Sequence, residues 1–511
     1  MKILSRSTWL CLALIFLSIL RSIHLNYISR QPLKTSSSQY QHTSQPSLNT
    51  ASLHAVPDKP NSIVDDTLLS DDPSNLFYFI QVSDLHISKF RTQTQHFLHF
   101  IQSVLPIVRP SFVVVTGDLT DAKGIDGVKT QQYKEEWQLY QNAIDQGIED
   151  DLPWYDMRGN HDCFDLPSWQ SNINLYRTFG KSSQLLEEGK GVYSWQMNQS
   201  YGQYQFIAMD ACPKKGPARP LNFYGYMPTN SMDRLESTLL DESTYNHTFL
   251  FTHYPTTTMI FGQSNILKSY DTTTKSLELE LGDMKDHGVY RIMAVDDDLV
   301  SFVDVELPAK LLTSSTTHGD GIPLTENNTV IWPEKTRLAP IILITNPKDA
   351  RFLLPGKEPI YRIRNSTHIR FLVFSDHDPH SLKVRIFVDN KHHPFPATYN
   401  KHTNSSLPLW TSSWSPEDFD DQITHSLGIQ VTTPDGLVGE SQVYFRVDGV
   451  QLKIGGGFGE WLIGTSVATL VSRGEKKSGE GGRRMEGVCK YIYIYIYIYI
   501  FWGGDNLKGD V

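Results

Sequence analysis

The chain has 511 residues, of which 39% are hydrophobic and 20% are charged, so it is long enough for two or three domains with hydrophobic cores. Its formal net charge of −10 excludes the basic surface of nucleic-acid-binding proteins, and we expect no nucleic-acid partner. The four cysteines are too few for a disulfide scaffold. Cys163 and Cys212 could pair in an oxidising compartment, although two buried thiols are the preferred interpretation.

Residues 1–24 read as a signal sequence or signal anchor. Lys2 and Arg6 precede an apolar run from Trp9 to Leu20, whose length fits a signal h-region better than a full membrane span. Arg21 follows in place of a small-x-small cleavage site, which favours an uncleaved anchor. We therefore expect a single-pass protein of the endomembrane system or plasma membrane, with luminal or extracellular folded domains.

Residues 25–72 are rich in Ser, Gln, Thr, Pro and Asp and predict a flexible linker. In residues 73–310, hydrophobic strands alternate with amphipathic helices over short links, which predicts a layered α/β domain. The expected strands are 76–82, 111–116, 154–157, 192–197, 204–209, 249–251 and 276–281, and the expected helices are 93–108, 133–144 and 232–240.

After residue 310 the pattern changes to short strands separated by turns, with no helical period. This pattern predicts a small all-β Ig-like sandwich in residues 325–450. The expected strands are Ile341–Thr345, His368–Phe374, Leu382–Asp389, Leu409–Ser413, His425–Thr432 and Gln442–Val447.

The last residues, 465–511, form a low-complexity tail that contains five Tyr-Ile repeats from Tyr491 to Ile500. A repeated TA dinucleotide encodes Tyr-Ile, so we interpret the tail as an aberrant product of non-coding repeat. The alternative, a structural strand, would be an aggregation hazard.

Four polar segments come directly after predicted strands: Asp84-Leu-His86, Gly117-Asp118, Gly159-Asn160-His161-Asp162 and Thr252-His253. Strand ends that converge on one edge of a sheet bring such side chains together. This mixture of oxygen and imidazole ligands suits two divalent or trivalent ions of Mn, Fe or Zn. We expect Asp84, His86 and Asp118 to hold the first ion.

Asp118 can bridge to a second ion, which Asn160 and His253 would complete. With the ions about 3.5–4 Å apart, a bridging hydroxide could attack the phosphorus of a phosphoester substrate. His161 is expected to donate a proton to the leaving oxygen rather than to bind metal, with Asp162 orienting it.

These segments resemble the calcineurin-like metallophosphoesterase superfamily, whose pattern is D-x-H, G-D, G-N-H-D or G-N-H-E, a lone His and then G-H-x-H. The resemblance covers about residues 74–310. Three segments are similar to sequences of the transmembrane protein 62 family and its plant relatives: Asp84-Leu-His86-Ile-Ser, Gly117-Asp-Leu-Thr-Asp-Ala-Lys123 and His253-Tyr-Pro-Thr. The resemblance implies a binuclear phosphoesterase fold and an endomembrane setting, without identifying the substrate.

The sequence departs from this pattern where G-H-x-H should follow. No histidine occurs between Pro255 and Ser276, and His287 is not expected to substitute. Each ion would then keep three protein ligands, which should weaken metal binding and activity. We therefore weigh an impaired, membrane-associated phosphoesterase against a non-catalytic membrane scaffold or binding protein with a degenerate site.

Other polar residues receive structural interpretations. Asp121 and Lys123 are expected to be helix-cap and surface residues, and His96 and His99 to be structural. The run Asp296-Asp-Asp298 is expected to be a solvated turn.

Overall fold

The computed structural model describes residues 68–149, 151–213, 215–216, 222–239, 245–261, 276–308, 322–400 and 407–452. The expected N-terminal anchor, most of the linker, the domain boundary at 310 and the tail lie outside these residues. Within the described part of the chain, none of the helices has both the length and the apolar composition needed to cross a membrane.

A five-stranded sheet of order β10-β9-β1-β2-β3 organises the α/β domain. Neighbours β1, β2 and β3 run parallel, whereas β9 pairs antiparallel with both β1 and β10. All of β9 and nearly all of β1 are buried, as expected for mainly apolar strands that are covered on both faces. The bounds are β1 Leu76–Val82, β2 Val113–Val115, β3 Trp154–Asp156, β9 Val289–Asp296 and β10 Leu299–Glu306.

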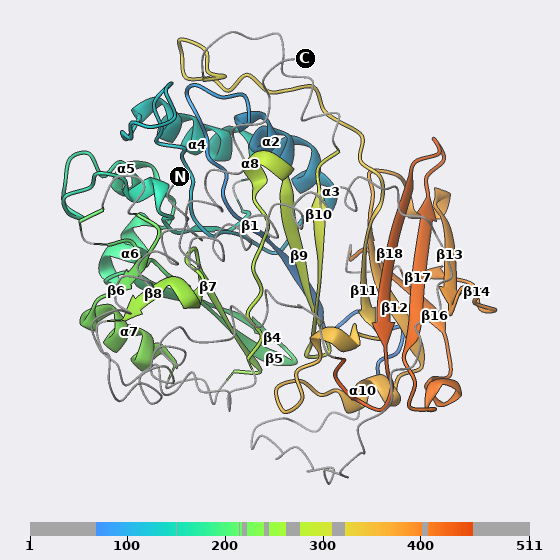
Figure 1. Cartoon of the computed structure of the whole chain (residues 1–511). Helices are drawn as coiled ribbons and strands as arrows, with labels where there is room; N and C mark the ends of the chain where they lie inside the picture. The colour runs from blue at the N-terminus through green and yellow to red at the C-terminus, as the bar shows by residue number, and fades with distance from the viewer. Residues whose placement is uncertain are drawn as a thin grey trace, which may run out of the picture. The chain divides into compact units, whose positions relative to one another are not determined.

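A second sheet, of order β4-β5-β7, packs against the first (Figure 1). The ring of Phe79 in β1 lies 5.5 Å from that of Phe206 and 6.2 Å from that of Phe251 in the second sheet. A short parallel pair, β6-β8, forms a third sheet among the described residues of this domain. The bounds are β4 Val192–Gln199, β5 Gly202–Met209, β6 Gly225–Met227, β7 His247–Thr252 and β8 Met259–Phe261.

The predicted helices are present. The helix expected at 93–108 forms as α2, a π-helical segment η1 and α3; Pro106, which has no N–H, follows the widened segment. The bounds are α2 Thr94–His99, η1 Phe100–Val104, α3 Leu105–Val108, α4 Lys134–Gly147, α5 Tyr176–Phe179, α6 Ser183–Glu188, α7 Thr229–Leu239 and α8 Met284–His287, with 3-10 turns η2 His161–Cys163 and η4 Thr256–Thr258.

The Ig-like sandwich is confirmed. Its two sheets, β11-β12-β16-β15 and β14-β13-β17-β18, contain only antiparallel pairs. Phe371 and Trp410 of one sheet share a buried core with Ile429 and Phe445 of the other. The bounds are β11 Ile341–Asn346, β12 His368–Phe374, β13 Lys383–Val388, β14 Lys391–His392, β15 Thr398–Tyr399, β16 Leu409–Ser413, β17 His425–Thr432 and β18 Val438–Phe445.

The end of the predicted flexible linker is ordered, so that prediction is wrong for residues 68–72. Leu69 is fully buried in the core of the sandwich, and its carbonyl accepts a hydrogen bond from Thr367 N at 2.9 Å. Arg370 Nη1 donates to Asp72 O at 2.9 Å. The polar composition of residues 25–72 did not reveal this contact, because it depends on the burial of a single leucine, Leu69.

The turn between β9 and β10 is buried rather than solvated. Asp296 is 1% exposed, and its carboxylate accepts Nε and Nη2 of Arg370 at 2.9 and 2.7 Å and Thr345 Oγ1 at 2.6 Å. These contacts join the α/β domain to β11 and β12. The interpretation as a solvated turn is therefore wrong. The local sequence did not show this burial, because the partners lie 49 and 74 residues further along the chain.

The segment Ser276–Leu281, predicted as a strand, has no regular secondary structure. None of the described strands pairs with it. Its alternating pattern defines two faces, but a strand also needs a neighbour to satisfy its backbone N–H and C=O groups.

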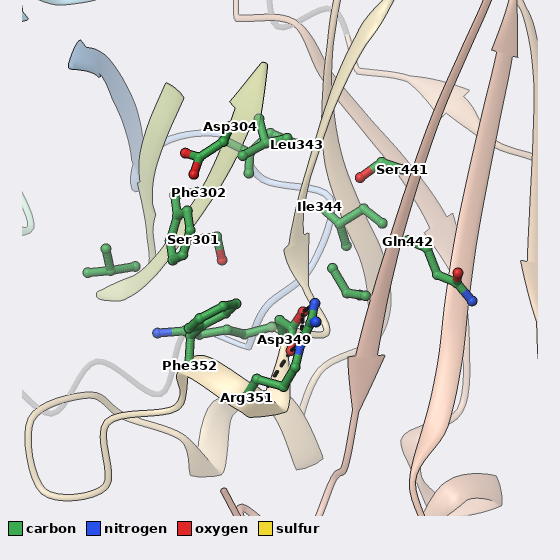
Figure 2. A pocket seen from close by; sticks show the side chains of 14 residues that line it. Ser301, Phe302, Asp304, Leu343, Ile344, Asp349, Arg351, Phe352, Ser441 and Gln442 are labelled. Carbon is green, nitrogen blue, oxygen red and sulfur yellow. Dashed lines mark hydrogen bonds and ion pairs between the residues drawn. The ribbon is translucent and has the colours of Figure 1, made fainter. Parts of the chain in front are cut away.

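A cavity of about 200 Å³ lies between β10, β11, β18 and the 3-10 turn η6, Ala350–Phe352 (Figure 2). Ser301, Asp304 and Arg351 are among its lining residues, and none of the predicted site residues lines it.

Candidate metal centre

The backbone after β1 and β2 is held in an uncommon conformation. Asp84, His86 and Asp118 have φ angles of 55°, 45° and 52°, in the left-handed region that residues other than glycine seldom adopt. Asp84 N donates to Gly117 O at 3.0 Å, and His86 N donates to Asp118 O at 2.9 Å. The two loops fix each other, which is how strained backbone persists at functional sites.

Two glycines allow the loops to approach. Gly117 has φ of 95°, and a Cβ there would lie 2.7 Å from Gly159 N and 2.8 Å from His253 Cβ. A Cβ on Gly159 would lie 2.2 Å from Asp118 Oδ1. Glycine at these positions therefore brings the loops of Asp118, Asn160 and His253 together.

The candidate ligands come from two sheets, not from one sheet edge as predicted. Asp84, Asp118 and Asn160 follow β1, β2 and β3 of the five-stranded sheet, whereas His253 follows β7 of the second sheet. Strand order cannot be read from a single sequence, and in the structure the loops after β2 and β7 of the two sheets are in contact, with His253 Nδ1 2.9 Å from Thr116 O.

Asp118 lies at the centre of the cluster. Its Oδ2 is 3.2 Å from His86 Nε2 and 3.8 Å from His161 Nε2, and its Oδ1 is 3.4 Å from His253 Nε2. Two groups of possible ligand atoms share it: one with His86 and His161, the other with Asp84 and His253. In each group the atoms lie within 4.8 Å of one another, so Asp118 is placed to bridge two ions.

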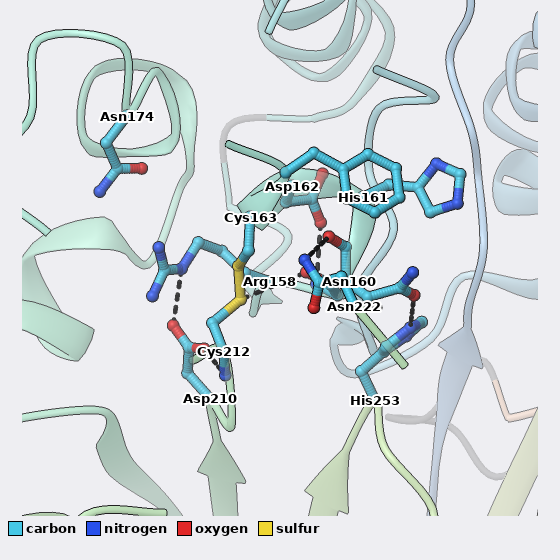
Figure 3. Close-up of a disulfide and its surroundings, with 12 residues drawn as sticks. Arg158, Asn160, His161, Asp162, Cys163, Asn174, Asp210, Cys212, Asn222 and His253 are labelled. Carbon is cyan, nitrogen blue, oxygen red and sulfur yellow. Dashed lines mark hydrogen bonds and ion pairs between the residues drawn. A yellow bond between two sulfur atoms is a disulfide. The ribbon is translucent and has the colours of Figure 1, made fainter. Parts of the chain in front are cut away.

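The ring of His253 shows that this cluster suits a cation. Its Nδ1 donates to Thr116 O at 2.9 Å, which fixes the ring with Nε2 facing inward. Nε2 lies 3.0 Å from Asn160 Oδ1 and 3.4 Å from Asp118 Oδ1 (Figure 3). A positive charge at this point is stabilised by the Asp118 carboxylate and the Asn160 amide oxygen, and a histidine held at its other nitrogen is typical of metal ligands.

Sequence reasoning missed Asp121. It is 1% exposed, its Oδ1 lies 3.3 Å from His86 Nδ1, and its carbonyl accepts from His161 Nδ1 at 2.5 Å. Lys123, also buried, has Nζ 3.3 Å from the same Oδ1. Neither residue is the cap or surface residue expected. The available signal was the spacing of two carboxylates in Asp118-x-x-Asp121.

Asp162 does not orient His161 as predicted. Its carboxylate accepts three backbone N–H groups, from Gly159 at 2.9 Å, Leu119 at 3.1 Å and Thr120 at 3.0 Å. These bonds join the loop after β3 to the loop after β2. Asp162 therefore orders the loops, and Asp121 is the residue that holds the ring of His161.

Burial and close charges shift the pKa values of the cluster in opposite directions. Burial would raise the pKa of Asp118, but the rings of His253, His161 and His86 outweigh it and hold that pKa well below its usual value. Burial would lower the pKa of His86, but Asp118, Asp121 and Asp84 raise it well above normal. For His161 burial prevails and the pKa falls well below its usual value.

Cys163 and Cys212 form a disulfide beside the cluster, so the preference for two thiols is wrong (Figure 3). The two cysteines are 49 positions apart and belong to no recognisable cysteine motif, which is why their spacing did not predict the bond. His287 lies in α8 with Nδ1 2.7 Å from Asp283 Oδ2, outside both candidate ligand groups among the described residues.

Comparison with known proteins agrees with this geometry. Residues 77–280 match the family model "Calcineurin-like phosphoesterase", and residues 336–451 match "TMEM62 Ig-like domain". The chain is 29% identical over 384 residues to mouse (Mus musculus) "Transmembrane protein 62", covering 70% of this chain and 53% of the relative.

It is 23% identical over 480 residues to the Arabidopsis thaliana protein named "Putative metallophosphoesterase", covering 76% of this chain and 60% of the relative. The chain thus spans between half and two thirds of the length of these relatives. A solved structure, "GAP50 the anchor in the inner membrane complex of Plasmodium", aligns with 45% of this chain and 85% of its own at 14% identity and a TM-score of 0.21, a similarity too low to support an argument.

Proposed function

Because this chain carries a calcineurin-like phosphoesterase domain followed by the TMEM62 Ig-like domain, we propose that it is a membrane-associated, metal-dependent phosphoesterase that hydrolyses a phosphate ester. The observation that supports this most is the convergence of the Nε2 atoms of His86, His161 and His253 on the Asp118 carboxylate. Each ring has its Nδ1 against an oxygen atom, so all three present the inner nitrogen to the same point.

We propose that His86, Asp84 and Asp118 hold one ion and that Asp118, Asn160 and His253 hold the other. Bound ions of Mn, Fe or Zn would generate the nucleophile from water and neutralise charge on the phosphoryl oxygens. His161, fixed at Nδ1 by the Asp121 carbonyl, has Nε2 at 3.8 Å from Asp118, beyond hydrogen-bond distance. That nitrogen is therefore available to exchange a proton with the leaving oxygen.

The missing G-H-x-H segment sets the expected level of activity. The sequence from Pro255 to Ser276 has no histidine, so each ion would have three protein ligands and water in the remaining positions. A carboxylate that contacts the other nitrogen of a histidine ligand, as Asp121 does at His86 Nδ1, is worth about 10–100-fold in metal affinity, and a missing direct ligand should cost at least as much. We therefore propose weak metal binding and slow turnover.

We propose that the phosphoesterase and Ig-like domains face the lumen or the cell exterior, with residues 1–24 as a membrane anchor. The Cys163–Cys212 disulfide supports this location, because disulfides persist in oxidising compartments and are rare in the cytosol. The name of the mouse relative supports a membrane setting.

Hydrolysis by the full-length chain tests the proposal. The chain, made in a eukaryotic secretory system, is loaded with Mn²⁺ and assayed on an aryl phosphate diester, beside Asp118→Asn and the control His287→Ala. We expect slow turnover that Asp118→Asn reduces at least about 100-fold, since bridging is lost, and that the control retains. Turnover unaffected by Asp118→Asn contradicts the proposal, and no turnover in a chain that binds no Mn²⁺ favours the non-catalytic scaffold.

A further inference from the structure

The loop Gly159–Cys163 carries Asn160 and His161, and it is held from two sides. On the inner side, the Asp162 carboxylate accepts hydrogen bonds from the backbone that follows Asp118. On the outer side, Cys163, which is 1% exposed, is bonded to Cys212, which is 8% exposed, with 6.2 Å between their Cα atoms. The residue that makes the inner contacts, Asp162, is thus directly followed by the residue that forms the disulfide, Cys163.

Further contacts link the same loop to the residues around Cys212 (Figure 3). Arg158, directly before Gly159, donates from Nε to Asp210 Oδ2 at 2.7 Å, and both side chains are buried. The other oxygen of Asp210 accepts Cys212 N at 2.9 Å. Asn222 Nδ2 donates to Asn160 O at 3.0 Å. The disulfide is the covalent member of this outer set of contacts.

We propose that Cys163 and Cys212 are positioning residues of the metal centre, which is an extension of the proposed function. The disulfide fixes the loop so that Asn160 Oδ1 faces His253 Nε2, the contact that defines the second ion site. The bond closes a chain segment with a sequence separation of 49, so its loss frees many conformations. Reduction by a dithiol breaks the S–S bond, adds two electrons and two protons to give two thiols, and oxidises the dithiol to its own disulfide.

The consequence is a redox-dependent ion site. After reduction, the outer set keeps its hydrogen bonds, Arg158–Asp210, Asp210–Cys212 N and Asn222–Asn160, but no covalent bond, and the loop samples positions in which Asn160 no longer faces His253. Metal affinity should then fall by about 10-fold, the scale of other supporting interactions around metal ligands. A role in fold stability alone would lower the melting temperature without changing affinity in the folded protein.

The test uses the full-length chain with Cys11→Ser and Cys489→Ser as the reference, so that only one disulfide can form. Unreduced peptide mapping should find the Cys163 and Cys212 peptides linked. Mn²⁺ titration at 10 °C then compares the reference, the dithiothreitol-reduced reference and the added double change Cys163→Ser/Cys212→Ser. Amide hydrogen exchange of residues 159–163 is measured in parallel, with β17 as the internal control.

We expect about 10-fold weaker Mn²⁺ binding and at least about 10-fold faster exchange in residues 159–163 after reduction or substitution, with β17 unchanged. Unlinked peptides in the unreduced chain overturn the proposal, as do unchanged affinity and exchange after reduction. If the reference binds no Mn²⁺, the proposed function fails, while the exchange of residues 159–163 still decides whether the disulfide positions the loop.

Discussion

Asp118 and the glycines around it determine whether a metal centre can form. The carboxylate lies within 3.8 Å of three imidazole nitrogens, and it can do so only because Gly117 and Gly159 leave room for the loops. The sequence predicted the residues that face this carboxylate but not Asp121, which supports two of the rings. A buried second carboxylate depends on neighbours from other loops, which a local pattern does not contain.

Gly159→Ala should remove metal binding while the protein stays folded. The added Cβ would lie 2.2 Å from Asp118 Oδ1 and 2.3 Å from Asp118 N, so the bridging carboxylate and its backbone have to move. Gly428→Ala is the matched control, because its Cβ meets only Phe387 Cβ at 4.0 Å. Metal content by mass spectrometry should fall for Gly159→Ala and stay at the wild-type value for Gly428→Ala. Equal metal content in both variants would contradict this account of the loop approach.

Asp121→Asn should weaken Mn²⁺ binding by about 10-fold without unfolding the domain. The amide oxygen of asparagine can still accept a hydrogen bond from His86 Nδ1. It lacks the negative charge that makes His86 Nε2 a stronger electron-pair donor to the metal. Isothermal titration with Mn²⁺ measures the change, with the exposed residue Asp126→Asn on the same loop as control. An affinity equal to that of the control would show that Asp121 has no supporting role.

At the scale of elements, the sequence predicted what depends on neighbouring residues. The bounds of β1, β12, β16 and β17 agree with the predicted strands, since alternation or continuous apolar character identifies them. Ser276–Leu281 has the alternation but no partner strand, and the division of the site between two sheets depends on packing between distant segments. The local sequence pattern thus predicted where the strands lie, whereas which strands pair with one another was seen only in the structure.

His425 in β17 should make the Ig-like sandwich pH-dependent. Its Nδ1 lies 2.8 Å from Asp389 Oδ2 and its Nε2 3.0 Å from Asp421 Oδ1. Burial would lower its pKa, but the two carboxylates outweigh burial and raise it above 6.5. Because the folded state then binds the proton more tightly than the unfolded state, this stabilisation is complete below about pH 6.5 and is lost as pH rises through the raised pKa.

Thermal unfolding of the full chain between pH 5.5 and 8.5 measures this effect. Wild type should lose stability towards the alkaline end relative to His425→Gln, whereas the exposed residue His380→Gln should follow wild type. Parallel pH profiles for wild type and His425→Gln would rule out the protonated histidine as a source of stability.

At the scale of the whole described chain, the α/β domain and the sandwich are joined by a buried ion pair. Arg370 and Asp296 are 0% and 1% exposed at the side chain, and Arg370 also donates to the backbone of Asp72. The sequence predicted both domains but no fixed connection between them. The partners are 74 residues apart, and each alone resembles an ordinary surface charge.

Asp296→Asn should destabilise the chain by about 3–5 kcal/mol, because it leaves the Arg370 guanidinium buried without its counter-charge. The double change Asp296→Leu/Arg370→Met should be less destabilising than Asp296→Asn, since it removes both charges. Urea unfolding followed by tryptophan fluorescence gives the free energies of unfolding. A double variant that is less stable than Asp296→Asn would contradict this interpretation of the ion pair.

Anomalous X-ray scattering from crystals of the Mn²⁺-soaked chain shows directly whether Asp118 bridges two ions. We expect two anomalous peaks that share Asp118, one beside His86 and Asp84 and the other beside Asn160 and His253. Asp118→Asn crystals should lack both peaks. Wild-type crystals with no anomalous density at Asp118, or with Mn²⁺ bound only elsewhere on the chain, would contradict the assignment of a two-metal centre.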